Sequence, residues 1–329
     1  MKLYKSIFRT EINEHIAIRA AVYAERTIEQ NSSVLKEFDD YLCNIDLKSK
    51  ELEAQTVENW IQGLSGKTHT IANKVSQLRL FCQYLQANGI AAYIPPPYKT
   101  HDEYVPYLFS EHECNSIFHA ADNIEISNNQ TNPWIQLEFP IILRLLYACG
   151  LRLGEALSLQ VQNIDFDGGY LSLFRTKNKK QRLVPMAASM HETLKRYCLV
   201  MDLIAKPDAY VFPGKNSDIP ISAKSVRRQF DRIIQTLKIE SPGRQSHERG
   251  PCMHCFRHTF AFKSFSKAEQ AGRPLDDSVP FLSTYLGHKS LSETEKYLKF
   301  SSIMYPDALH SFTSYIGDVF PEVKYEESI

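Results

Sequence analysis

Three absences limit what this chain of 329 residues can be. It has no run of about 18 apolar residues, so we expect no helix that spans a bilayer and no membrane partner. Residues 1–9 lack the apolar core of a secretory signal. The seven cysteines are odd in number and irregularly spaced, which favours reduced thiols over a disulfide framework. We therefore expect a cytoplasmic protein.

Net charge is also absent, because 38 Lys and Arg balance 38 Asp and Glu. The balance hides an uneven distribution. Residues 171–263 contain 18 Lys and Arg against 7 Asp and Glu, an excess of 11 positive charges. Such a stretch supplies the sequence-independent phosphate affinity of nucleic-acid binders, although a charged run can also be a merely solvated face.

A proline-rich segment divides the chain. Pro95, Pro96 and Pro97 cannot continue a helix, and we expect residues 95–108 to form an extended linker. It would separate a domain at 1–94 from a larger one at 109–329. In the first domain, apolar residues at helical spacing predict a small helical bundle, with a cap at Thr68 for its last long helix.

The second domain reads as mainly helical with one small antiparallel β-sheet. Strand-like alternation at 170–174 and at 182–184 flanks a basic turn, which predicts a hairpin. The expected helix boundaries are a capping box at Ser110, a helix at 134–149 kinked or restarted at Pro140, a stop at Gly150, a helix from Ser222 through Ile239, and breaks at 272–274 and Gly287.

Six polar residues of this second domain share a chemistry suited to phosphodiesters. Arginine forks bind non-bridging phosphate oxygens, and a tyrosine can act as a covalent nucleophile, without a metal. The six are Arg152, Lys177, His254, Arg257, His288 and Tyr297.

Local context supports some of the six more than others. His254 and Arg257 are three residues apart, which places both side chains on one face of a helix. Arg152 precedes Glu155, a carboxylate that could hold the guanidinium rigidly. Tyr297 is one of 17 tyrosines and gains weight only from its place nine residues after His288.

A zinc site is a competing interpretation. Cys252 and Cys255 have zinc-ligand spacing, and His258 or His247 could contribute. Structural zinc requires four ligands in a tetrahedral array, and the sequence does not supply a complete set. We therefore expect neither metal nor cofactor.

In order and spacing the six residues resemble the catalytic set of the tyrosine recombinases, the phage integrase family. The resemblance rests on Gly-Leu-Arg around Arg152, His-Cys-Phe-Arg-His-Thr from His254, Leu-Gly-His around His288, and the step to Tyr297. Phe256 stands where the family usually has leucine. The family's hairpin lysine falls on Lys177, with Lys179 as the runner-up.

The resemblance implies a two-domain DNA clamp, formed by a helical core-binding domain and an α+β catalytic domain with a C-terminal tail helix. It implies site-specific recombination through a 3′-phosphotyrosine, with Arg152 and Arg257 on the phosphate, His254 and His288 beside them, and a lysine as general acid. Further contacts to DNA are expected from Lys179, Lys180, Arg182, Lys224, Arg227 and Arg228.

The implied partner is double-stranded DNA with inverted-repeat core sites, bound by four copies of a chain that is monomeric without DNA. Integration, excision or transposition of a mobile element would be the task. An apolar face at 305–323 would dock on a neighbouring copy or pack on its own domain. A type IB topoisomerase-like nicking and closing enzyme and a non-catalytic DNA-binding protein of the same fold are the alternatives.

Overall fold

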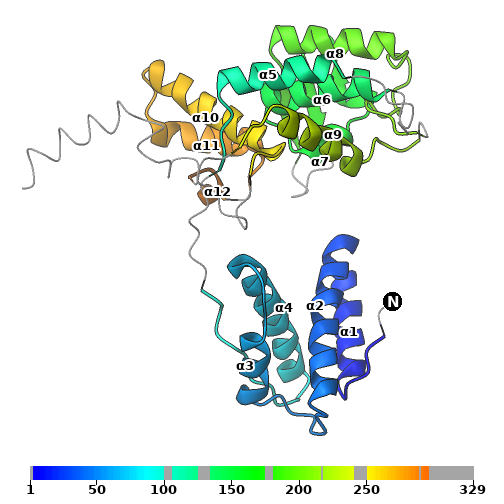
Figure 1. Cartoon of the computed structure of the whole chain (residues 1–329), viewed down its shortest axis with the longest axis vertical. Helices are drawn as coiled ribbons and strands as arrows, with labels where there is room; N and C mark the ends of the chain where they lie inside the picture. The colour runs from blue at the N-terminus through cyan, green and yellow to red at the C-terminus, as the bar shows by residue number, and fades with distance from the viewer. Residues whose placement is uncertain are drawn as a thin grey trace, which may run out of the picture. The chain divides into compact units, whose positions relative to one another are not determined.

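The computed structural model describes residues 3–99, 106–124, 134–174, 181–215, 218–240, 250–288 and 290–295. The chain divides into two compact units, Met1–Tyr104 and Val105–Ile329 (Figure 1). The division falls inside the proline-rich segment. Among the residues that the structure describes, no helix has both the length and the apolar character needed to cross a membrane.

The first unit is a helical bundle, as the apolar spacing predicts (Figure 1). Helix α2 packs against both α1 and α4. Lys67, not Thr68, is the N-cap of α4, so the expected cap is wrong by one residue and Thr68 begins the helix. The helices are α1 (Arg9–Ala20), α2 (Glu25–Asn44), α3 (Ala54–Gln62) and α4 (Thr68–Ala87).

Three phenylalanines, Phe8, Phe38 and Phe81, lie fully buried in the core of this unit. Asp39 is buried beside them, and its carboxylate accepts hydrogen bonds from the backbone N–H groups of Lys5 (2.9 Å) and Ser6 (2.9 Å). A buried charge costs free energy unless it is hydrogen-bonded, so these bonds tie the first residues of the described chain to α2.

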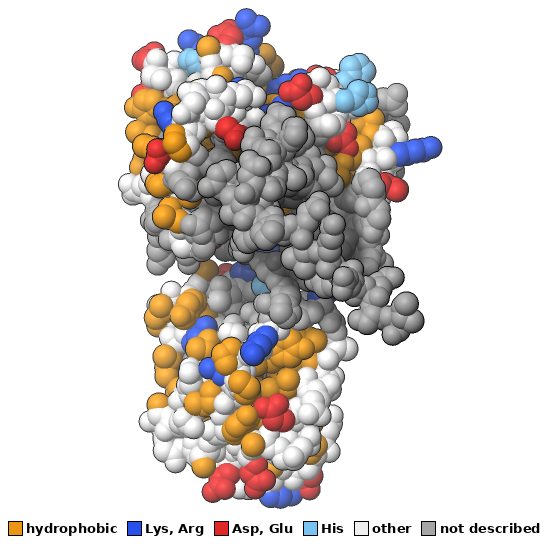
Figure 2. Space-filling model, turned by 90° about the vertical axis from the view of Figure 1, so that its left-hand side faces the viewer, with side chains coloured by type: hydrophobic (Ala, Val, Ile, Leu, Met, Phe, Trp, Pro, Cys, Tyr) orange, Lys and Arg blue, Asp and Glu red, His pale blue; other side chains and the backbone are white. Residues whose placement is uncertain are grey.

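The surface of the first unit carries apolar side chains that its own core does not use. Ile18, Val22 and Tyr23, at and just after the end of α1, are exposed. Another face of this unit, the one turned toward the viewer in Figure 2, also carries hydrophobic side chains, beside Lys and Arg side chains. Scattered exposed apolar residues are ordinary, but these three lie close together along the chain.

The second unit is mainly helical with a three-stranded antiparallel sheet of order β1-β2-β3, as expected. Leu171 pairs with Val184, and Leu173 pairs with Arg182 across the β2–β3 hairpin. Its elements are α5 (Glu111–Asp122), α6 (Ile135–Cys149), α7 (Leu153–Leu157), the 3₁₀ helix η1 (Val161–Asn163), β1 (Ile164–Asp165), β2 (Tyr170–Leu173), β3 (Arg182–Pro185), α8 (Ala188–Val200), α9 (Ala223–Thr236), α10 (His254–Gln270), α11 (Leu275–Leu286) and α12 (Ser292–Glu295).

Most expected boundaries of these elements are confirmed. Ser110 and Glu113 form the capping box of α5, Gly150 ends α6, and the side chain of Ser222 caps α9. Helix α6 is one continuous helix although Pro140 lies inside it. Helix α9 ends at Thr236, three residues earlier than expected, because Lys238 adopts a left-handed φ of 53°.

An aromatic cluster around Phe256 holds α10 in the core of the second unit. The Phe256 ring lies 4.9 Å from Phe109 and 5.9 Å from both Phe118 and Phe230, measured between centroids. Such pairs add to the free energy gained from burial. Phenylalanine thus fills the position where the resembling family has leucine, and it fixes the helix turn that carries Arg257.

Candidate active site

Arg257 is the most deeply buried cation of the site. Only 1% of its side chain is exposed, and its guanidinium lies where two helices end. Its Nη1 donates to the carbonyl oxygen of Gly150 (2.7 Å), just after α6, and its Nη2 donates to that of Leu286 (2.6 Å), the last residue of α11. Two helix ends that are far apart in sequence therefore share one guanidinium.

Glycines allow these helix ends to approach. Gly150 and Gly287 are the C-caps of α6 and α11, with left-handed φ values of 59° and 65°. A Cβ atom on Gly150 would lie 2.5 Å from Cδ1 of Phe260, closer than van der Waals contact permits. Both positions therefore need glycine, for the turn and for the close packing.

Arg152 and Glu155 make the contact expected from the sequence. Arg152 is the N-cap of α7, and its backbone N–H donates to Oε2 of Glu155 (2.9 Å) while its Nη1 donates to Oε1 (2.9 Å). The same guanidinium lies 3.5 Å from the carbonyl oxygens of Leu286 and Gly287. Arg152 is thus held beside the helix end that also binds Arg257.

Arg182 differs from expectation. The sequence predicts that it contacts DNA, but its Nη1 and Nη2 bind the two carboxylate oxygens of Glu155, at 3.1 and 2.8 Å. Only 7% of its side chain is exposed. Its place in β3, opposite Leu173, directs the side chain toward α7 and away from solvent. We call Arg152, Arg182, Arg257 and Glu155 the arginine cluster.

Glu155 is the only carboxylate among these four residues. Burial by itself would raise its pKa, but the hydrogen bonds and positive charges of Arg182, and then of Arg152, outweigh burial and hold the pKa at about 2. Arg257 brings a third guanidinium group near it, with Nη1 4.0 Å from Oε2. The carboxylate is therefore ionised at neutral pH.

His288 joins Arg257 to α12. Its Nε2 lies 3.1 Å from Nη2 of Arg257, and its Nδ1 lies 2.6 Å from Oγ1 of Thr294, a fully buried residue. A guanidinium can only donate, so Nε2 must accept and the ring proton must sit on Nδ1, which donates to the Thr294 hydroxyl. The two neighbours of His288 thereby select one neutral tautomer.

Two histidines of this region are held neutral. Burial, followed by the charges of Arg257 and Arg152, lowers the pKa of His288 to about 3. Burial, followed by His254 and Arg257, lowers the pKa of His258 to about 3. His254 is the first residue of α10, is exposed, and has its ring 4.6 Å from that of His258.

The other expected site residues are distributed as follows. Lys177, Lys179, Lys180 and Tyr297 lie outside the described residues, as do His247 and the expected tail helix. The structure describes the two hairpin strands on either side of 175–180 and the chain as far as Glu295.

Helix α9 presents the expected basic face. Lys224, Arg227 and Arg228 are exposed, while Val226 and Phe230 on the other side are buried in the core. These three exposed cations can therefore contact a polyanion. They belong to a different segment of the chain from the residues of the arginine cluster.

The cysteine pair that suggested zinc lies at the start of α10. The Sγ atoms of Cys252 and Cys255 are 3.5 Å apart. Within the described ranges, no group of three or more His, Cys, Asp or Glu side chains could hold a metal ion.

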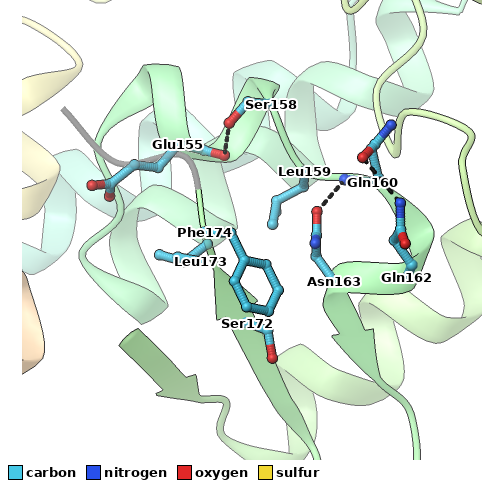
Figure 3. Close-up of a pocket in the computed structure, with 9 residues that line it drawn as sticks. All are labelled: Glu155, Ser158, Leu159, Gln160, Gln162, Asn163, Ser172, Leu173 and Phe174. Carbon is cyan, nitrogen blue, oxygen red and sulfur yellow. Dashed lines mark hydrogen bonds between the residues drawn. The ribbon is translucent and has the colours of Figure 1, made fainter. Parts of the chain in front are cut away.

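A small pocket of about 200 Å³ lies behind Glu155. Figure 3 shows the Phe174 ring in the middle of its lining and the amides of Gln160 and Asn163 on one side, whereas the carboxylate of Glu155 points away from them. The pocket therefore borders the arginine cluster without containing its charged groups.

Sequence reasoning missed two contributors to the site. The sequence alone assigns no role in the site to Thr294, and it presents Arg182 only as one of several hairpin cations. The signal for Thr294 is its place six residues after His288, and the signal for Arg182 is its place at the first residue of a strand.

Known tyrosine recombinases resemble this chain in sequence and in fold. A tyrosine recombinase XerC of Staphylococcus aureus (strain JH9) is 26% identical over 288 residues, which are 85% of this chain and 88% of that protein. The structure of the XerH site-specific recombinase in a post-cleavage complex with palindromic difH substrate has a TM-score of 0.65 at 18% identity, covering 87% of this chain and 80% of that chain.

The Tn1549 transposon integrase in complex with transposon right end DNA is 16% identical with a TM-score of 0.62, and the match covers 94% of this chain and 98% of that chain. These solved structures support the fold. The model of the phage integrase family matches residues 108–302, the greater part of the chain and all of the arginine cluster. The chain therefore belongs to the phage integrase family, the tyrosine recombinases, whose members are DNA strand-transferring site-specific recombinases.

Proposed function

We propose that this recombinase cleaves and rejoins duplex DNA through a covalent 3′-phosphotyrosine formed on Tyr297. One observation carries the proposal: Arg152, Arg257 and His288, from three distant segments, meet at the ends of α6 and α11. Arg152, with 20% of its side chain exposed, is the member of the cluster most open to a phosphate.

The chemistry assigned to Tyr297 is an in-line displacement. Its phenolate oxygen attacks the scissile phosphorus, a P–O bond to tyrosine forms, and the P–O bond to the 5′ oxygen breaks. A phenol has a reference pKa of about 10, so nearby cations must favour loss of its proton. The exposed imidazole of His254 is the group we assign to accept that proton.

The remaining roles follow from charge. Arg152 and Arg257 bind the non-bridging oxygens and stabilise the pentacoordinate transition state. Neutral His288 holds the Arg257 guanidinium through Nε2. Lys177, or else Lys179, protonates the departing 5′ oxygen. Because the phosphotyrosine retains the energy of the phosphodiester, a 5′-hydroxyl of a second DNA can reverse the reaction without ATP.

DNA binding by two domains is part of the same proposal. Domain 1–94 would bind the core site on one side and domain 109–329 on the other, with the linker 95–108 between them. The exposed cations of α9 (Lys224, Arg227 and Arg228) support phosphate contacts outside the active site.

We also propose the assembly and the biological task. Four copies would act on two inverted-repeat sites, starting from monomers, and the exposed apolar residues Ile18, Val22 and Tyr23 of the first unit support contacts between copies. The likeness to a transposon integrase supports a mobile element as the substrate. The chain would act in the cytoplasm, where such DNA resides.

A nicked suicide substrate tests the proposed chemistry. Cleavage near the nick releases a short 5′-hydroxyl strand, which traps the covalent complex for detection by denaturing electrophoresis. Wild-type protein should accumulate the adduct without added metal, and Tyr297→Phe should form none while still binding the same DNA. Adduct formation by Tyr297→Phe would refute the assignment of the nucleophile.

The same substrates separate the alternatives. A topoisomerase-like enzyme would relax supercoiled circles without exchanging flanking DNA between two sites, and a non-catalytic protein would bind without forming an adduct. Membership of the recombinase family does not favour either alternative.

A further inference from the structure

The geometry of Arg182 sets it apart from the other basic residues of the hairpin region. Both terminal nitrogens contact Glu155, and the side chain is almost fully buried. Gly287 provides the space it occupies, because a Cβ atom there would lie 2.9 Å from Nη1 of Arg182 and 3.3 Å from its Cδ. Glu155 of α7 therefore binds this guanidinium, and Gly287 at the end of α11 leaves room for it.

The charges around Glu155 show what Arg182 contributes. Arg152 and Arg257 face the same carboxylate, at 2.9 and 4.0 Å. His288 and His258 are held neutral. Among the residues that the structure describes around Glu155, three guanidinium charges therefore oppose one carboxylate charge, which leaves two positive charges for a bound phosphate. Without Arg182 only one would remain, and Glu155 would compete directly with the phosphate for Arg152 and Arg257.

We infer that Arg182 is a positioning residue of the recombination site: it neutralises and orients Glu155, so that the charges of Arg152 and Arg257 act on the scissile phosphate. The inference rests on the proposed function. It replaces the expectation that Arg182 binds DNA directly with a role through Glu155, to which both of its terminal nitrogens are bound.

A second role of Arg182 would give different results. Its ion pair with Glu155 also ties β3 to α7, so it could act by placing the hairpin and the lysine expected at its tip. A role through the lysine concerns the leaving oxygen, whereas a role through Glu155 concerns the charge on the non-bridging oxygens. Two chemically altered substrates separate these two effects.

The experiment measures single-turnover formation of the covalent adduct by Arg182→Gln on nicked substrates. With natural DNA we expect a rate about ten- to a hundredfold lower, below the hundredfold or more typical of losing a direct oxyanion donor, and half-site binding within about twofold of wild type. A neutral methylphosphonate at the scissile position should shrink the defect, because less counter-charge is needed. A 5′-phosphorothiolate, whose leaving group needs no proton, should not shrink it.

Coupling to Glu155 is tested with a double-mutant cycle. In a Glu155→Gln background, the added Arg182→Gln change should cost less than about threefold, since there is no carboxylate left to neutralise. Arg144→Gln is the matched control, because Arg144 binds both oxygens of Asp122 (2.8 and 2.7 Å) on an exposed part of the same unit. It should leave the cleavage rate unchanged.

Several outcomes would overturn the inference. Rescue by the phosphorothiolate would assign Arg182 to the hairpin, and equal losses with and without Glu155 would exclude action through the carboxylate. If Arg182→Gln does not fold, Arg182→Lys decides. It keeps the positive charge, so it should cleave natural DNA at close to the wild-type rate, and a loss as large as that expected for Arg182→Gln would overturn the inference. Failure of wild-type protein to form an adduct would instead refute the proposed function.

Discussion

Replacing Thr294 with valine should disturb His288, because the two side chains are joined by a hydrogen bond. The Nδ1–H of His288 donates to the Thr294 hydroxyl at 2.6 Å, and Thr294 is fully buried. Valine keeps the shape of threonine and removes the acceptor, and a buried site gives water little access to replace it. A tautomer change offers no relief, because a proton on Nε2 would face the donating Nη2 of Arg257 at 3.1 Å.

The expected cost follows from that unsatisfied donor. A buried polar group left without its partner costs about 1–3 kcal/mol. For a domain of this size, each kcal/mol lowers the melting temperature by roughly 2–4 °C. We therefore expect Thr294→Val to melt about 2–12 °C below wild type, and Thr294→Ser, which retains the hydroxyl, to lie close to wild type.

The assay combines thermal unfolding with ¹⁵N NMR of labelled histidine. The chemical shifts of the two ring nitrogens report which one is protonated, and loss of one signal pair in His288→Asn identifies the residue among the 11 histidines. Wild type should show a protonated Nδ1 at neutral pH. An unchanged melting temperature together with an unchanged tautomer population in Thr294→Val would refute the reasoning.

Three further predictions use other parts of the structure. The stability contributed by His258 and His288 should be fully present above pH 6.5 and fall as the pH drops toward 3, because these histidines take up protons in the unfolded state but stay neutral in the folded state. In urea unfolding between pH 7 and 5, the free energy of unfolding should change by at most about 1.4 kcal/mol per pH unit for each histidine. A free energy of unfolding that does not change with pH would contradict this prediction. Replacing Lys224, Arg227 and Arg228 with glutamine should reduce the slope of log affinity against log salt by about 0.9 for each phosphate that these side chains no longer neutralise, as measured by DNA titration, whereas an unchanged slope would remove α9 from the interface. Gly150→Ala should destabilise the protein by about 2–4 kcal/mol in chemical unfolding, from left-handed strain and the contact with Phe260; Gly272→Ala, with φ 76° but open space around it, should lose less.

Short sequence patterns predicted many of the helix ends and the hairpin, because these features depend on residues that are neighbours in the chain. Gly150 was predicted as a helix stop, Ser110 and Ser222 as caps, and the hairpin from alternation on both sides of a basic turn. Each depends on residues within one or two turns of the chain. The error at Thr68 was of the same local kind, since a cap and the first helical residue differ only in backbone angles.

The partners within the site could not be predicted in the same way. Arg152 and Glu155 are three residues apart, and their contact was anticipated. Arg182 reaches Glu155 across 27 residues, and Arg257 reaches Gly150 across 107, so no periodicity reports these contacts. A basic residue beside a hairpin turn looks the same in sequence whether it faces DNA or a buried carboxylate. Only the register of β3 distinguishes the two.

The meeting of α6 and α11 at Arg257 has an electrostatic consequence. Each helix carries a macrodipole whose C-terminal end is equivalent to about half a negative charge. The carbonyl oxygens of Gly150 and Leu286, at 2.7 and 2.6 Å, bring both ends to the same guanidinium. Together these backbone carbonyl groups act as a counterion for Arg257, and unlike a carboxylate they are not protonated by acid. Acid that neutralises Glu155 would deprive Arg152 and Arg182 of their partner, while Arg257 would keep its own until the helices unfold.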